Sequence, residues 1–511
     1  ALQSLKPDYY YGRKEISMRR LSKILFAIFA GLIPLAGFAD VYSEIEARVV
    51  EHELCNGMRF LIFERHEAPL VSMVIMVKAG AVNEVTNKTG LAHFLEHLAF
   101  KGTHTIGTTS YKSERKALSE LDAAFGAYHT AKQKGADSAT VAALYAEFKQ
   151  KQEQASGYVV QGEFSEIYER NGGSGLNAST SYDYTNYYLT LPSNRFELWC
   201  AMESDRLANS VFREFYSERD VILEERRMWI DNNPYGLLYE ELQSIAYKTH
   251  PYGHPTLGHY SDIQNLSRQD VRAFYETYYV PQHMSVAIVG DVDADEVITL
   301  IDAYFGRIPP KPDPPELVTT EPRQPGIRRV QMKKGKSPRL YMLFHTVPAG
   351  HPDELTLDLL SIVLISGHSS RLYRSLVEEK KIASNLYLAR GNFTYGGYMR
   401  LVGSPMEGVS AAQLEEAVLE ELAALEENPI TQEELDAALA RWKVWFYYPI
   451  SSNSSLAFFL SWYDACKGGW RELFDRVEEV EKVTCQDLMD AAERYLDPDR
   501  RTVAIMEVED E

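Results

Sequence analysis

The sequence predicts an α+β protein built from two homologous halves, each with a β-sheet flanked by helices. The main observation is a duplicated unit, in which a helical segment, a proline and a strand occur at 266–289 and again at 483–506. The offset is constant, since four pairs of identical residues are each 217 positions apart: Gln269 and Gln486, Asp270 and Asp487, Pro281 and Pro498, and Val286 and Val503. Ser267 and Thr484 each precede an aspartate by three residues, which is typical of a capped helix start. A duplicated α+β unit explains this pattern.

A proline-rich break separates the two halves. At 511 residues the chain is too long for one ordinary core. Seven prolines lie close together: Pro309, Pro310, Pro312, Pro314, Pro315, Pro322 and Pro325. Because proline lacks a backbone donor and stiffens the chain, we expect a semi-rigid linker at 307–325. The sequence therefore predicts an N-terminal domain at 40–306 and a C-terminal domain at 326–511.

Both halves contain strand and helix patterns. Runs rich in Val, Ile, Tyr and Phe predict strands at 58–65, 71–78, 187–191, 286–290, 339–345 and 397–402. Helical spacing of apolar residues predicts helices at 90–100, 193–209, 217–230, 355–365, 411–427 and 431–447. An insertion rich in Ala, Glu, Lys and Gln at 112–168 predicts a helical hairpin that turns near 135–138. The hairpin either packs on the surface or forms a functional lid.

The N-terminal residues resemble a secretory signal. Basic residues after Met18 precede an apolar run at 24–38, and Gly37 and Ala39 are small residues at the positions that favour cleavage after Ala39. The run is shorter than the ~20 residues of a spanning helix. This segment predicts secretion across an inner membrane into a bacterial periplasm, with an uncleaved membrane anchor as the alternative. Residues 1–17 lie upstream of this signal and are not expected to belong to the fold.

Composition limits the partners. Lys+Arg 53 against Asp+Glu 73 gives a formal net charge of −20, which argues against binding to nucleic acid. The four cysteines are scattered without the spacing of a zinc ribbon: Cys55, Cys200, Cys466 and Cys485. Buried free thiols are expected, although one or two disulfides remain open.

One short segment carries the chemistry. On the helix predicted at 90–100, His93 and His97 are one turn apart, so both imidazoles can face one metal ion. Glu96 lies beside them within reach of a water molecule. Two neutral imidazoles suit zinc, and H-x-x-E-H is a peptidase signature. The alternative is a pair of partly buried histidines beside a solvated glutamate.

Several blocks resemble the insulinase/pitrilysin peptidases, the family that includes mitochondrial processing peptidase. They are Gly90-Leu-Ala-His-Phe-Leu-Glu-His, Phe100-Lys-Gly-Thr, Leu176-Asn-Ala-Ser-Thr with Asp183 and Thr185-Asn-Tyr-Tyr, Glu218 to Glu225, and His250-Pro-Tyr-Gly with Pro255 and Gly258. The resemblance runs from about Leu54 to the C-terminus. It implies two α/β-roll halves with mainly antiparallel sheets, and a zinc-dependent endopeptidase that cleaves extended peptides or small unfolded proteins.

The resemblance also implies the remaining site residues. Glu225 becomes the third ligand of one zinc ion per chain, and Glu218, seven residues earlier on the same helix face, becomes its supporting residue. Glu224 competes by position but points about 100° away around the helix. Glu96 is then the base that takes a proton from water and returns it to the leaving amine.

The resemblance further implies that substrate binds at a strand edge near 177–180, where an extended peptide adds as a further strand. Asn177 and Ala178 are the candidates for backbone contacts, with a turn as the alternative role for Asn177. His250, His254 and His259 form a packed turn rather than a second metal site, because their spacing fits no common ligand pattern.

The C-terminal half lacks two residues that the resemblance leads one to expect. Active relatives carry an Arg and, seven residues later, a Tyr that face the zinc, and here these positions hold Val377 and Ser384. Arg371 and Tyr387 are out of register. We therefore expect a homologous partner chain to supply the Arg and Tyr in a heterodimer, unless another residue of this chain replaces them. The alternative function is a non-catalytic assembly or peptide-binding subunit.

Overall fold

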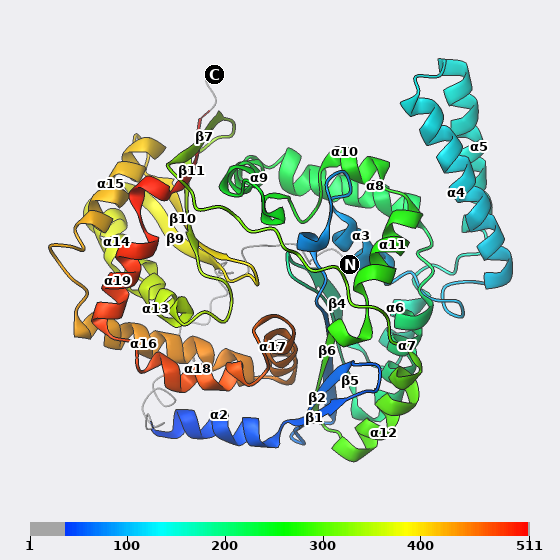
Figure 1. Ribbon diagram of the computed structural model, residues 1–511, viewed down its shortest axis with the longest axis horizontal. Helices are drawn as coiled ribbons and strands as arrows, with labels where there is room; N and C mark the ends of the chain where they lie inside the picture. Colours follow the sequence, from blue (N-terminus) through cyan, green and yellow to red (C-terminus); the bar gives the residue numbers. More distant parts are fainter. Residues whose placement is uncertain (1–35, 509–511) are drawn as a thin grey trace, which may run out of the picture.

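The computed structural model describes residues 36–508, which form two β-sheets (Figure 1). The first sheet has the order β1-β2-β6-β3-β5-β4. Its strands are β1 (Val50–Glu53), β2 (Arg59–Glu64), β3 (Leu70–Val77), β4 (Ser174–Thr180), β5 (Thr185–Pro192) and β6 (Met284–Gly290). The second sheet has the order β7-β11-β8-β10-β9. Its strands are β7 (Arg328–Lys333), β8 (Arg339–Thr346), β9 (Ala383–Gly391), β10 (Gly397–Pro405) and β11 (Thr502–Glu507).

The two sheets share one topology. β2 pairs with β6 in parallel, and the pairs β6–β3, β3–β5 and β5–β4 are antiparallel. In the second sheet β7 pairs with β11 in parallel, and β11–β8, β8–β10 and β10–β9 are antiparallel. The helix that precedes β6 is α11 (Arg268–Tyr278), with its capping box at Ser267. The helix that precedes β11 is α19 (Cys485–Tyr495), with its capping box at Thr484. The predicted α+β fold of two homologous halves is therefore confirmed.

The helices cover both sheets. Those of the first half are α3 (Leu91–Leu98), α4 (Tyr111–Gln133), α5 (Ser138–Ser156), α6 (Glu163–Arg170), α7 (Phe196–Asn209), α8 (Phe215–Arg226), α9 (Pro234–Ala246), α10 (Tyr260–Asn265), α11 and α12 (Ala294–Tyr304). Those of the second half are α13 (Asp353–Ile365), α14 (Arg371–Tyr373), α15 (Ala411–Ala423), α16 (Gln432–Phe446), α17 (Asn453–Cys466), α18 (Glu472–Val480) and α19. Alternate strand residues point to opposite faces, so Phe60 and Ile62 of β2 join the core with α3 while Leu61 and Phe63 join a second core.

Each half places one helix on the sheet of the other. The second core packs β2, β3 and β6 against Leu456 and Leu460 of α17, which belongs to the second half. In the same way Leu238 and Leu242 of α9, from the first half, pack against Leu343 of β8 and the rest of the second sheet. Figure 1 shows α17 and α9 between the two sheets. This exchange buries apolar surface from both halves and joins them.

The linker is also bonded to both halves. The side chain of Gln282 donates to the carbonyl of Lys311 (2.6 Å). Glu321 accepts hydrogen bonds from three successive backbone N–H groups, at 248–250. Gln324 donates to the carbonyl of Arg501 (2.9 Å) in the second half. These bonds hold the proline-rich segment against both halves.

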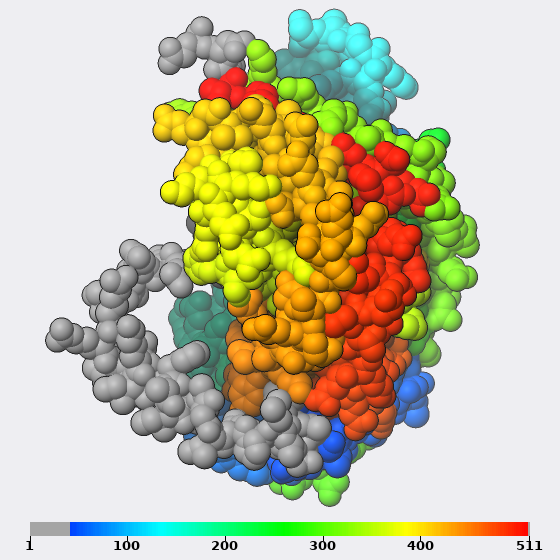
Figure 2. Space-filling model, turned by 90° about the vertical axis from the view of Figure 1, so that its left-hand side faces the viewer, coloured from blue at the N-terminus to red at the C-terminus, as the bar shows by residue number. Residues whose placement is uncertain are grey.

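The first helix of the described residues, α2 (Ala36–Arg48), lies along the second half (Figure 1). Figure 2 looks onto that half, whose yellow to red segments cover most of this face, with the blue α2 region at its lower edge. Tyr42 and Ile45 of α2 are buried in the same core as α17. The predicted signal lies outside the described residues, apart from the backbone of 36–39 at the start of α2. Within 36–508 no helix combines the length and apolar character needed to cross a bilayer.

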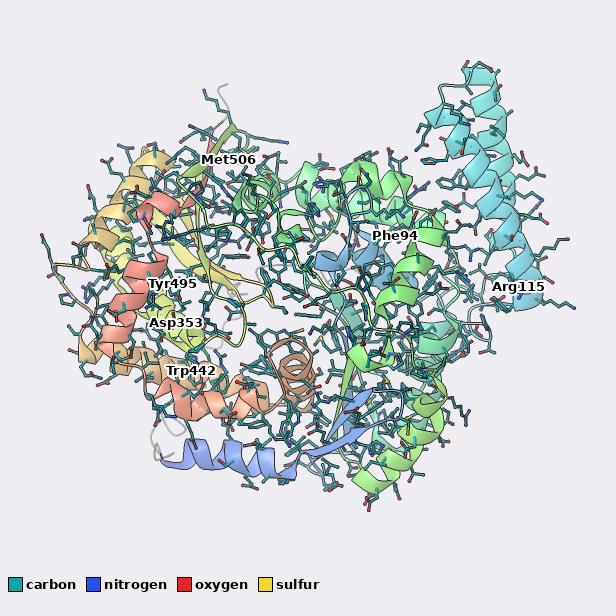
Figure 3. All side chains as sticks on the ribbon, in the orientation of Figure 1. Phe94, Arg115, Asp353, Trp442, Tyr495 and Met506 are labelled. Atoms are coloured by element: carbon teal, nitrogen blue, oxygen red, sulfur yellow. The ribbon has the colours of Figure 1, made fainter. Side chains whose placement is uncertain are left out.

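The helical hairpin of α4 and α5 extends from the first half (Figure 1). Its turn lies between Gln133 and Ser138. Phe125 and Phe148, about midway along the two helices, pack against Tyr216 at the start of α8, with ring centroids 4.6 and 5.0 Å apart. Figure 3 shows Arg115 on this hairpin, apart from Phe94 in the core of the first half. The hairpin is thus attached to α8 at about mid-length, while its turn end projects from the body (Figure 1).

The four cysteines are free thiols. Cys200 and Cys466 are buried, as expected, whereas Cys55 is exposed and Cys485 is half-buried, so the expectation of buried thiols was wrong for these two.

Candidate metal centre

The helix that carries the two histidines is anchored by a buried carboxylate. α3 begins after Gly90, which has φ +88° and no side chain that could cap the helix. Glu84 fills this role: its Oε2 accepts from the N–H of Gly90 (2.7 Å) and its Oε1 from the N–H of Ala92 (2.8 Å). These bonds satisfy donors that a helix start leaves free. Burial raises the pKa of Glu84 to about 8, despite the two N–H groups that favour its charged form.

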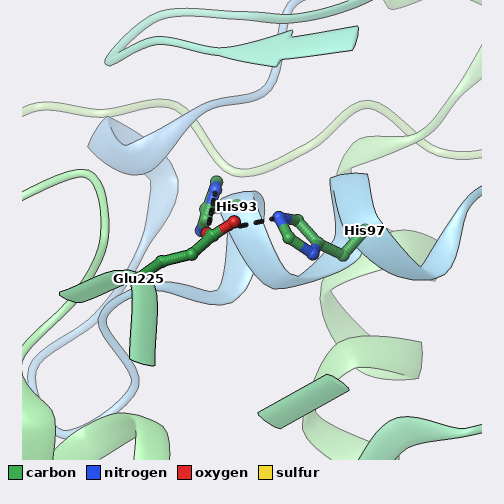
Figure 4. A group of neighbouring side chains, drawn as sticks. All are labelled: His93, His97 and Glu225. Carbon is green, nitrogen blue, oxygen red and sulfur yellow. Dashed lines mark ion pairs between the residues drawn. The ribbon is translucent and has the colours of Figure 1, made fainter. Parts of the chain in front are cut away.

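Three side chains converge beside this helix. The Nε2 atom of His93 lies 3.8 Å from Oε2 of Glu225, and Nε2 of His97 lies 3.6 Å from the same oxygen. One nitrogen or oxygen atom of each residue lies within 4.8 Å of the others (Figure 4). Glu225 comes from the last turn of α8, far along the chain from the histidines. The structure therefore brings the three predicted ligands together.

The donor set fits a zinc ion. Tetrahedral zinc with bonds of 2.0–2.1 Å holds its ligand atoms about 3.4 Å apart, so small side-chain shifts would close this group around an ion. Oε2 of Glu225 is buried and has no hydrogen-bond partner within the described residues. A buried carboxylate oxygen without a donor is costly unless a cation neutralises it. Two imidazoles and one carboxylate are also the protein ligands of known catalytic zinc sites.

The surroundings of the two histidines shift their pKa values in opposite directions. Glu218 lies 3.3 Å from Nδ1 of His97 and 2.5 Å from Nζ of Lys101. This contact keeps a proton on Nδ1 and leaves the Nε2 lone pair toward Glu225. Burial holds the pKa of His93 well below its ordinary value, so His93 is neutral. Burial also opposes charge on His97, but the carboxylates around it raise its pKa overall, and a metal cation would compete with that proton.

Glu96 lies next to this group and is itself buried, with 5% of its surface exposed. Its Oε2 accepts a hydrogen bond from Oγ1 of Thr180 (2.6 Å), the last residue of β4. Burial raises the pKa of Glu96, while the bond from Thr180 and the charge of His97 lower it. Sequence reasoning did not assign Thr180 to the site, although the residue belongs to one of the blocks that carry the resemblance.

The other predicted residues have distinct positions. Glu224 is turned away, since its side chain is 65% exposed and pairs with Arg227. Asn177 and Ala178 lie in β4, the last strand of the first sheet, opposite Tyr188 and Tyr187 of β5. Asn177 is therefore a strand residue, and the alternative of a turn is excluded.

The three loop histidines do not form a second cluster. Nδ1 of His250 accepts from the N–H of Tyr252 (3.3 Å), and the rings of His254 and His259 are 6.1 Å apart. Among residues 36–508, His93, His97 and Glu225 are the only group of three or more potential ligands that lie together.

As far as residue 508, where the described part of the chain ends, the second half offers no equivalent metal site. Val377 packs against the core of that half, and the hydroxyl of Ser384 donates to the carbonyl of Ser404 (3.2 Å). Arg371 is held by Glu434 and by the carbonyls of Asn428 and Pro429. An arginine with three such partners is not available for a substrate, which agrees with the expectation that it is no substitute.

Comparisons with known proteins match two family descriptions to this chain. The family described as "Insulinase (Peptidase family M16)" matches residues 59–133 and 154–259. The one described as "Peptidase M16 inactive domain" matches residues 265–441. The unmatched residues 134–153 fall in the α4–α5 hairpin.

Individual relatives cover most or much of the chain. "Zinc protease PqqE" of Helicobacter pylori is 28% identical over 454 residues, which are 87% of this chain and 88% of that protein. "Probable mitochondrial-processing peptidase subunit beta" of Schizosaccharomyces pombe is 24% identical over 346 residues. The matched region is 65% of this chain and 64% of that protein. The crystal structure of a protease from Helicobacter pylori superposes with a TM-score of 0.75 at 26% identity, over 90% of this chain and 99% of that one.

Both halves match domains of the same peptidase family, and the solved relative has the same fold over nearly the whole described chain. The chain belongs to the insulinase family, peptidase family M16.

Proposed function

We propose that this chain is a zinc-dependent endopeptidase that hydrolyses extended peptides or small unfolded proteins. The observation that carries the proposal is the convergence of His93, His97 and Glu225 beside a buried Glu96. Hydrolysis of a peptide bond needs an electrophile, a base for the attacking water and a way to hold the substrate, and each has a counterpart here.

The residues divide this work among them. His93, His97 and Glu225 would hold the zinc ion, and Glu218 orients His97. A bound zinc ion supplies Lewis acidity, which polarises a carbonyl and lowers the pKa of water. Glu96 takes the proton of the attacking water and passes it to the leaving amine. Thr180 donates to Glu96 and fixes the direction of its carboxylate.

The edge of β4 supplies the substrate platform. β4 ends at Thr180, which contacts Glu96, so a peptide that added to this edge would pass close to the base. Asn177 and Ala178 are the residues whose backbone groups would pair with it. Main-chain pairing is tolerant of sequence, which suits a peptidase acting on extended chains.

Metal removal tests this function. We expect the purified chain to contain one zinc ion and to lose both zinc and peptide hydrolysis on treatment with a strong chelator, with recovery when zinc is restored. Zinc is measured by mass spectrometry and hydrolysis with a quenched fluorescent peptide. A chain that contains no zinc and takes up none would instead support a non-catalytic assembly or peptide-binding subunit.

We also propose that a homologous partner chain completes the site. Val377 and Ser384 occupy the positions of the expected Arg and Tyr, and the relative from Schizosaccharomyces pombe is named as a subunit. Without the donors that these residues would supply, turnover by this chain alone should be about 10²-fold lower than that of the pair. The measurement is kcat with and without the co-purified partner. Full turnover of the isolated chain would rule the partner out as a source of catalytic groups.

Secretion to a periplasm, or anchoring to its membrane, remains part of the proposal and rests on residues 18–39 alone.

A further inference from the structure

The last residue of α8, Arg226, is buried next to Glu225 although it contacts none of the three proposed ligands. Only 6% of its surface is exposed. Its Nη1 donates to the carbonyl of Gly258 (2.7 Å), and its Nη2 lies 3.0 Å from both carboxylate oxygens of Glu240 on α9. A buried guanidinium with these partners holds the end of α8 in one position.

The carbonyl that Arg226 contacts belongs to a loop pressed against the other ligand helix. Gly258 has φ +79°, and a Cβ at this position would lie 2.5 Å from the carbonyl oxygen of Thr89 and 2.6 Å from the nitrogen of Gly90. Gly90 is the residue before α3. A side chain at Gly258 would therefore push the loop away from the start of the helix that carries both histidines.

Hydrogen bonds fix the same contact. The N–H of His259 donates to Oγ1 of Thr89 (2.8 Å), and that hydroxyl donates to Oδ2 of Asp262 (2.7 Å). The loop at 257–259 thus cannot slide along the N-terminus of α3 without breaking these bonds.

We infer that Arg226 is a positioning residue for the metal centre. It links α8, which carries Glu225, to the loop at 257–259, and that loop packs against the start of α3, which carries His93 and His97. The inference rests on the proposed zinc site and names a determinant of its geometry. The guanidinium of Arg226 and the carbonyl of Gly258 add a link between two ligand helices that Glu218 of α8 also joins directly, through its contacts with His97 and Lys101. Removal of a residue that orients metal ligands in this indirect way typically lowers metal affinity about 10- to 100-fold.

The test compares zinc affinities of purified full-length variants by competition with a chromophoric chelator. Arg226→Lys keeps the charge but cannot reach Gly258 and both oxygens of Glu240 together. We expect its zinc Kd to rise about 10-fold or more. Arg227→Gln is the matched control: Arg227 is the next residue, its side chain is 51% exposed and it pairs with the outward-facing Glu224. Its zinc Kd should stay within about twofold of the parent's, as expected for an exposed pair.

Glu240→Gln provides a second variant in case Arg226→Lys fails to fold. This substitution weakens the contact of Arg226 with residue 240 and leaves its bond to Gly258. We therefore expect a smaller rise in zinc Kd than for Arg226→Lys. The zinc Kd should still be clearly higher than that of Arg227→Gln. Thermal unfolding of the metal-free proteins is measured in parallel. A purely structural role would lower the unfolding temperature and leave the zinc Kd of the folded protein unchanged.

The outcomes separate this inference from the proposed function. Tight zinc binding by the parent and by both folded variants alike would overturn the role of Arg226 and leave the peptidase proposal intact. Failure of the parent to bind zinc would overturn both.

Discussion

Replacing Glu96 with glutamine is expected to lower kcat for peptide hydrolysis about 10²- to 10⁴-fold while leaving zinc content unchanged. Glutamine has nearly the same shape and can still accept the hydrogen bond that Thr180 donates to Glu96. It cannot accept a proton from water, so only the proton-transfer role is removed. The measurement pairs steady-state kinetics with metal analysis of the same preparation.

Glu224→Gln is the control for this substitution. It makes the same chemical change on α8, at a side chain that is 65% exposed and turned away from the group. We expect its kcat to match that of the parent. If Glu96→Gln retained more than a tenth of the parent's kcat, Glu96 would not be the base.

Replacing Glu225 with alanine is expected to weaken zinc binding more than about 100-fold. This is a larger loss than that expected from replacing a residue that only orients a ligand, such as Arg226. The substitution removes one of three protein ligands and the only negative charge among them. Oε2 of Glu225 is buried without a hydrogen-bond donor, so its loss should cost the metal-free protein little stability. Metal-free Glu225→Ala should then unfold at a temperature no lower than the metal-free parent.

The comparison with Glu224→Ala makes this result specific. Both substitutions truncate a glutamate in the last turn of α8, but only one of the side chains faces the histidines. Equal zinc affinity of the two variants would exclude Glu225 as a ligand.

Local sequence signals were enough to predict the elements that hold the histidines. The apolar spacing around His93 and the capping boxes at Ser267 and Thr484 act within one or two helical turns, where period and propensity decide structure. The same holds for the buried strands β3 and β6, which lie at the predicted positions to within one or two residues. The constant offset of 217 residues predicted two homologous halves, and the two sheets have the same topology over the strands that they share.

Among the helices that the sequence did not predict, two form on the surface of the other half. α17 follows a serine-rich stretch that is typical of loops, and its helix is stabilised by burial of Leu456 and Leu460 on the first sheet. α9 begins with Pro234 and contains Gly236, which are usual helix breakers, yet proline fits the first turn of a helix. No local sequence pattern indicates that either segment packs against the sheet of the other half.

Apart from Glu218, the residues that support the site could not be predicted from the sequence. Glu84 caps α3 from a turn, and Arg226 reaches a carbonyl 32 residues away in a loop. Such contacts leave no periodic pattern and no fixed spacing in the sequence, because they depend on the tertiary structure that brings distant segments together. The ligands themselves lie on regular helices, which is why spacing and resemblance could point to them.

The most direct measurement is a crystal structure of the chain grown with zinc, with anomalous data collected on both sides of the zinc absorption edge. The proposed site predicts one strong zinc peak within about 2.0–2.2 Å of Nε2 of His93, Nε2 of His97 and a carboxylate oxygen of Glu225. A crystal in which zinc is absent from these three atoms, or in which Glu225 has turned away from the ion, would contradict it.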